Sequence, residues 1–143
     1  MALNVIFSDI RSERRVVPVG NDIAPGTPII SGGRPAVTLT GSRDYAGNAV
    51  TISAPGHTPL TILGGKGGQS LPTDDSATIT FTGTYAFDVE GATDATEYGE
   101  PVYIDEATNT LSLTGTTKFG IVEFYRGELS ETDVAVTIGV NLG

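Results

Sequence analysis

The only histidine, His57, is the first residue whose type could support catalysis. A nucleophilic triad holds a histidine beside a serine and a carboxylate in fixed geometry. His57 instead stands between Pro55-Gly56 and Thr58-Pro59, a sequence typical of a turn, so we interpret it as a surface residue. With one histidine and no cysteine, the chain also lacks the usual ligand sets for zinc.

A glycine-rich run, Gly64-Gly65-Lys66-Gly67-Gly68, is the second candidate, because such runs can cradle phosphate groups. A phosphate-binding loop needs a glycine five positions before its Gly-Lys pair and a hydroxyl residue after the lysine. Leu60 and Gly67 occupy those positions here, and no helical pattern follows. The sequence therefore predicts that no nucleotide or other cofactor is bound.

Three groups of acidic residues could in principle hold a metal ion or act as an acid–base pair. Calcium loops place oxygen ligands at alternate positions around a glycine bend, and none of the three groups has that spacing. Paired carboxylates can also hydrolyse glycosides, but this depends on their separation in space. We interpret the groups as solvated turns, and we predict no metal site, no catalytic residue and no enzymatic activity. The groups are Asp74-Asp75, Asp94 with Glu97 and Glu100, and Asp105-Glu106.

The net charge of −9 is unevenly distributed along the chain. Residues 1–50 contain five arginines and four acids, for +1, and residues 51–143 contain three basic residues and thirteen acids, for −10. Nucleic-acid binding depends mainly on Lys and Arg, so this composition argues against a nucleic-acid partner. No apolar run approaches the ~18 residues of a membrane helix, and the N-terminus lacks the apolar core of a signal peptide. We expect no membrane partner and no secretion.

Period-2 alternation of apolar and polar residues indicates the fold class. It recurs in 77–81, 85–89, 102–114 and the last pair, 118–125 and 134–140, with turn residues every 8–12 positions. The pattern predicts an all-β fold, a small β-barrel or β-sandwich without a convincing helix. Its predicted core includes four aromatic residues, Phe81, Phe87, Tyr103 and Phe119.

The chain divides into an N-terminal arm, residues 1–15, and a single β domain, residues 16–143, with an insertion at 41–76. The arm has an apolar tip followed by arginines, and an ordinary edge strand is an equal alternative for that tip. Pro18 predicts that Val16–Val19 is an edge strand. The insertion predicts a projecting hairpin with strands at 49–52 and 60–63 and a flexible tip at Gly64–Gly68.

Five segments, in order, carry a resemblance to a known family. In this order and spacing they resemble the capsid cement, or head decoration, proteins of tailed bacteriophages. The chain departs from that family in its longer 41–76 segment and in Ile104, where the family often has tryptophan. The segments are Ala24–Ile29 (APGTPI), Pro35–Thr40 (PAVTLT), Ile79–Val89 (ITFTGTYAFDV), Gly99–Asp105 (GEPVYID, continuing to Leu111), and Phe119–Val122 (FGIV) with Val134–Ile138 (VAVTI).

The resemblance implies a non-catalytic structural protein of the virion. Such a protein would be made in the host cytoplasm, bind the major capsid protein on the capsid exterior as a homotrimer, and reinforce capsomer junctions. The arm supplies the predicted capsid or subunit contacts: Leu3, Val5, Phe7, Arg11, Arg14 and Arg15. Two alternatives are a trimeric nucleotide hydrolase of the dUTPase kind, whose phosphate motifs this chain lacks, and a carbohydrate-binding module of the virion surface.

Overall fold

The structure, a computed structural model, describes residues 4–7, 13–48, 50–62, 72–93, 95–124 and 133–139. Within these ranges the regular elements are strands, apart from the short 3-10 helix η1 (Ala46–Asn48). The prediction of an all-β fold is therefore confirmed. At three residues, the one helical segment described falls far short of what a bilayer crossing needs.

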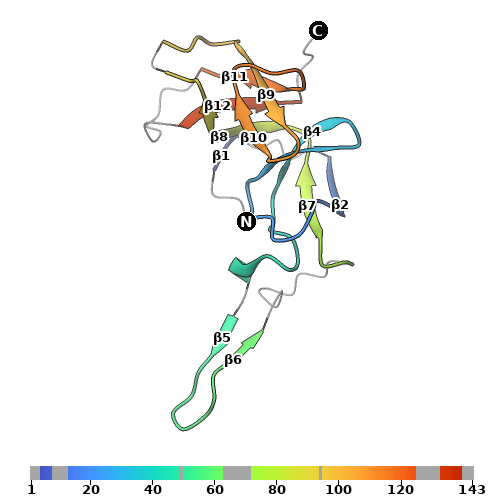
Figure 1. The fold of residues 1–143 in the computed structure, drawn as a ribbon, viewed down its shortest axis with the longest axis vertical. Coiled ribbons are helices and arrows are strands. Elements are labelled where there is room, and N and C mark those ends of the chain that lie inside the picture. The colour runs from blue at the N-terminus through green and yellow to red at the C-terminus, as the bar shows by residue number, and fades with distance from the viewer. Residues whose placement is uncertain are drawn as a thin grey trace.

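A closed five-stranded barrel forms one end of the molecule, at the top of Figure 1. Neighbouring strands are antiparallel except for one parallel pair, β8 with β10. The ring closes through a long ladder between β8 and β12, which runs from Asp133↔Asp88 to Ile138↔Gly83. In ring order the strands are β8 (Gly83–Glu90), β10 (Thr110–Ser112), β9 (Pro101–Asp105), β11 (Lys118–Val122) and β12 (Asp133–Ile138).

The barrel interior is filled by alternate residues of its strands. On β8, Tyr85, Phe87 and Val89 are buried while Asp88 and Glu90 are exposed. Phe87 packs edge-on against Phe119, with ring centroids 5.8 Å apart. Three of the four predicted core aromatics are buried, and the fourth, Tyr103 on β9, is half-buried. The sequence did not single out Tyr85, whose ring is fully buried.

A second, four-stranded antiparallel sheet lies beside the barrel. Its small core contains Ile29, Ala36, Ile79 and Phe81. The chain passes from β7 of this sheet directly into β8 of the barrel, with a bend at Phe81, and β8 begins at Gly83, whose φ of 121° is a conformation that favours glycine. In order across the sheet the strands are β2 (Arg14–Pro18), β7 (Ser76–Thr80), β4 (Arg34–Thr38) and β3 (Pro28–Ser31).

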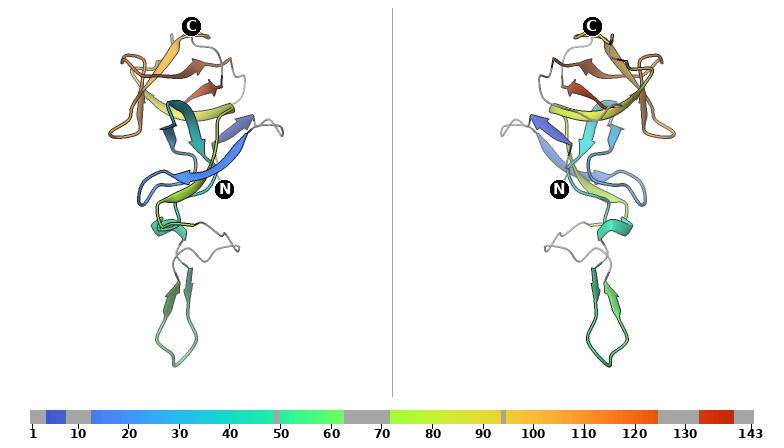
Figure 2. Two further views of the ribbon diagram at one scale, coloured as in Figure 1. Left: turned by 90° about the vertical axis from the view of Figure 1, so that its right-hand side faces the viewer. Right: turned by 90° about the vertical axis from the view of Figure 1, so that its left-hand side faces the viewer.

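A two-stranded hairpin projects from the far end of the second sheet, as Figures 1 and 2 show. It consists of β5 (Val50–Ile52) and β6 (Leu60–Ile62), paired from Val50↔Ile62 to Ile52↔Leu60. This register puts the turn at 53–59, where His57 N donates to Ala54 O over 3.1 Å. The predicted tip at Gly64–Gly68 is therefore wrong in position, because that run follows β6; it lies outside the described residues.

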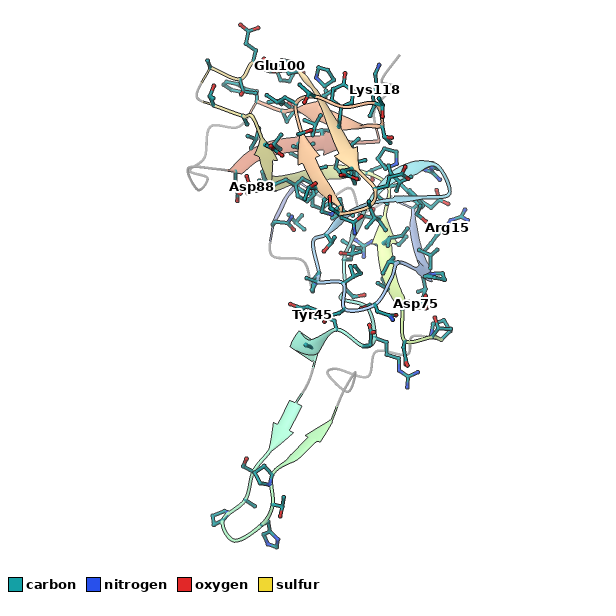
Figure 3. The ribbon with its side chains drawn as sticks, in the orientation of Figure 1. Arg15, Tyr45, Asp75, Asp88, Glu100 and Lys118 are labelled. Atoms are coloured by element: carbon teal, nitrogen blue, oxygen red, sulfur yellow. The ribbon has the colours of Figure 1, made fainter. Side chains whose placement is uncertain are left out.

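The base of the hairpin is fixed by hydrogen bonds around Asp44. One carboxylate oxygen accepts from Asp22 N (2.9 Å) and from Ser42 Oγ (2.7 Å), and these bonds lower the pKa of Asp44. Asp44 N in turn donates to Asp74 O over 3.0 Å, which ties the two ends of the insertion together. The chain before the hairpin and the chain after it are thus held together near Tyr45, which Figure 3 labels.

Candidate docking surface

β2 forms one edge of the four-stranded sheet in the part of the chain that the structure describes. It pairs along its whole length with β7, from Arg14↔Thr80 to Pro18↔Ser76. This position confirms the edge strand predicted for Val16–Val19. Pro18 suits it, because proline has no N–H to donate to a neighbouring strand. Val16 is 48% exposed, with the exposed Arg14 and Arg15 beside it in the sequence.

An arginine cluster lies along this edge, where Figure 3 labels Arg15. Glu13 accepts from Arg15 and, at 3.1 Å, from Arg34 on β4. The hydrogen bond from Arg15, and then the one from Arg34, hold the pKa of the Glu13 carboxyl below its usual value. Arg34 also stacks on Phe81, with its guanidinium carbon 3.9 Å from the ring centroid. Arg14 points to the other face of the sheet, because successive side chains of a strand alternate. The cluster of Glu13, Arg15 and Arg34 thus carries a net positive charge, although the whole chain carries −9.

The chemistry of this edge suits a protein contact rather than a reaction. An edge strand presents backbone N–H and C=O groups that a strand of a partner can pair with. Arginines and a proline on an edge also limit uncontrolled pairing between chains. A partner would therefore need acidic groups opposite the arginines, and these would set the register of the contact.

The six predicted contact residues do not lie on one element. Arg14 and Arg15 are together on β2, whereas Val5 and Phe7 belong to β1 (Val5–Phe7), which pairs with β8 of the barrel opposite Tyr85 and Thr84. Val5 is 36% exposed. Leu3 and Arg11 lie outside the described residues. The structure thus divides the predicted contacts between the edges of two sheets.

β1 (Val5–Phe7) is an edge strand, which is the alternative that the sequence left open for the apolar tip, and Asn4 just before it forms a defined anchor. Asn4 O accepts from Ala86 N over 2.8 Å, and Asn4 Nδ2 donates to Ala86 O (3.1 Å) and Gly26 O (3.2 Å). A Cβ at Gly26 would lie 2.4 Å from Asn4 Oδ1. Asn4 therefore joins the barrel to the turn before β3.

The other residues that the sequence suggested for catalysis or metal binding lie mainly in turns, where they are described. His57 is exposed in the hairpin turn. Glu100 Oε1 accepts from Glu97 N (3.1 Å) and Asp105 Oδ1 from Ala107 N (3.0 Å), so these acids stabilise turns. Among the described residues no three His, Cys, Asp or Glu side chains gather as a metal site would require. Asp94 lies outside those residues.

Sequence reasoning missed three members of the β2 surface: Glu13, Val16 and Arg34. Val16 could have been found from its place on the edge strand that Pro18 predicts, because an edge strand has no neighbouring strand on one side. No local signal links Glu13 to Arg34, which is 21 positions away and is brought near by the β3–β4 hairpin and by β7.

No family model matches this chain, and neither a curated protein nor a solved structure matches it.

Proposed function

We propose that this protein is a non-catalytic decoration protein of a phage capsid. It binds the major capsid protein on the outer surface of the head, as a homotrimer, and stabilises the junctions between capsomers. The proposal is supported by the resemblance of five ordered segments and by the small β-barrel. The observation that carries it is the β2 edge, where the exposed Val16, Arg14 and Arg15 lie on one strand.

Docking at β2 would combine three modest contributions to binding. A strand of the capsid protein would pair with the backbone of β2. Val16 would lose its remaining exposure. Burying such a side chain completely contributes about 1.5–3 kcal/mol, and because Val16 is 48% exposed, docking would add roughly half of that. Arg14 and Arg15 would meet acidic groups, which improves association rate and register. Three linked copies on a repeating lattice would then raise the overall avidity of individually weak contacts.

The test is the binding of the full chain to heads of the parent phage that lack it. In the variant Arg14→Glu/Arg15→Glu we expect at least ~10-fold weaker binding, about 1.4 kcal/mol. The control Arg43→Glu/Lys118→Glu changes the net charge equally at positions outside β2, and it should bind within ~3-fold of the unaltered chain, since screening weakens distant charges. Equal binding by both variants would contradict docking at β2.

A salt titration of the same binding gives an independent check. Because the arginines are exposed, their contacts with acidic groups should weaken as ionic strength rises. If binding did not change between low and high salt, the arginines would not contribute to it, and only the apolar and backbone contacts would remain in the proposal.

A further inference from the structure

Two aromatic side chains lie in solvent at one end of the barrel. Tyr98 is 65% exposed and Phe124 is 64% exposed, in contrast to the buried rings of Tyr85, Phe87 and Phe119. Both line one shallow hollow of about 240 Å³. Large exposed aromatics that share a concave surface often mark a binding site.

The backbone around the hollow is well braced. Gly99 N donates to Val122 O, and Val122 N to Glu100 O, both over 2.8 Å, so the turn before β9 is tied to the end of β11. Glu123 N donates to Ala135 O of β12, also over 2.8 Å. The backbone that carries Tyr98 and Phe124 is therefore held in place by hydrogen bonds among three separate segments.

The polar lining supplies both hydrogen-bond donors and acceptors. Glu123 Oε2 accepts from Thr137 Oγ1 at 2.9 Å and Oε1 accepts from Phe124 N at 3.1 Å, so this carboxylate has a fixed orientation. Asp133 adds a second carboxylate to the lining. Thr96 Oγ1 accepts from Thr93 N (2.8 Å), and Thr93 Oγ1 from Ala95 N (3.2 Å). A hydroxyl that accepts in this way still has its own hydrogen to donate.

This lining restricts the chemistry of a ligand. Among the described residues, those that line the hollow include no Lys or Arg, so a phosphate or other anion would face two carboxylates without a counter-charge from them. A purely apolar ligand would cover carboxylates without giving them a donor, which is costly. A neutral sugar ring satisfies both demands, because its C–H face packs on aromatic rings and its hydroxyls donate and accept.

We propose that the Tyr98–Phe124 hollow is a binding site for a neutral saccharide. The two rings stack on the sugar, Glu123 and Asp133 accept from its hydroxyls, and Thr93 and Thr96 donate to its oxygens. The volume is below the roughly 300–1,000 Å³ typical of drug-sized sites, so one or two sugar rings would occupy it. This proposal does not depend on the capsid role, because the hollow and the β2 edge belong to different sheets.

The experiment is an NMR titration of the isotope-labelled full chain with glucose, galactose, mannose, N-acetylglucosamine and their disaccharides, each to ~10 mM, a range that detects weak binding. We expect amide shifts confined to residues 93–99, 122–124 and 133–135. Tyr98→Ala and Phe124→Ala should each raise the Kd at least ~10-fold, while Tyr98→Phe, which keeps the ring, should stay within ~3-fold. Val16→Ala, an exposed apolar truncation on the other sheet, should leave the Kd unchanged.

Two rival occupants have distinct outcomes. A trimethylammonium probe would also suit aromatic rings beside carboxylates. Its binding would be salt-dependent, and if it bound while the sugars did not, the proposal would be overturned. If instead Tyr98→Ala reduced the oligomeric mass in sedimentation, the hollow would be a subunit contact. The proposal also fails if no sugar of the panel shifts these amides, or if the shifts persist in Tyr98→Ala/Phe124→Ala.

Discussion

The closed barrel and the four-stranded sheet are built from one continuous run of chain, yet they expose different groups. The barrel returns from β12 to β8, so its ring has no free edge, and β1 adds to it only beside Tyr85 and Thr84. The second sheet stays open and ends in β2. Closure makes the barrel a stable support, while the open sheet retains backbone groups for a partner.

The largest effect should come from the barrel interior. Phe119→Ala removes a fully buried ring that packs on Phe87, and we expect it to lower the free energy of unfolding by about 3–5 kcal/mol. Phe124→Ala is the matched control, because the same side chain is mostly exposed there and its loss should change stability by less than ~1 kcal/mol. Chemical denaturation measures both, and similar losses would refute the assigned barrel core.

A smaller loss of stability should follow when the hydrogen bonds of Asn4, which link the barrel to the second sheet, are removed. Asn4→Ala removes the donor to Gly26 O and Ala86 O and should destabilise the protein by about 1–3 kcal/mol, the cost of leaving these part-buried carbonyl groups unsatisfied. Asn21→Ala, at an exposed turn position, is the control. If the two variants unfold at the same denaturant concentration, β1 does not help to join the two sheets.

Removing the hairpin should change stability still less. Residues 47–71 can be replaced by a short glycine–serine linker, because Asp44 N and Asp74 O are already hydrogen-bonded at 3.0 Å. The free energy of unfolding should stay within ~1 kcal/mol, since loop length affects closure entropy only weakly. A cooperative unfolding transition like that of the full chain would show that barrel and sheet fold without the hairpin, and an unfolded product would contradict this.

The smallest effect concerns the β2 surface and pH. The folded state lowers the pKa of Glu13 through Arg15 and Arg34, so its contribution to stability is present at neutral pH and is lost as the pH falls through that lowered value. An NMR titration should find the Glu13 midpoint below 4.5. In Arg34→Met the midpoint should move upward toward its ordinary value, whereas an unchanged midpoint would exclude the Glu13–Arg34 pair from the surface.

Local patterns in the sequence were sufficient to predict individual strands but not how those strands pair with one another. Alternation at Tyr85, Phe87 and Val89 predicted β8, and Pro18 predicted the edge at β2. The β8–β12 ladder and the parallel β8–β10 pair join residues tens of positions apart, and no periodicity encodes which strands meet. The same limit hid the hollow that Tyr98 and Phe124 both line, because the turn before β9 and the end of β11 become neighbours only when those strands pair.

The direct passage from β7 into β8 has a mechanical consequence. A pull on β2 passes through its ladder with β7 and then along the backbone into β8. β8 is held by six antiparallel pairs with β12, whose hydrogen bonds lie perpendicular to the strand. Tension along β8 therefore loads those bonds in shear, and they must break together rather than one after another. The protein, when pulled through β2, would therefore withstand more force than one whose strand hydrogen bonds break one at a time.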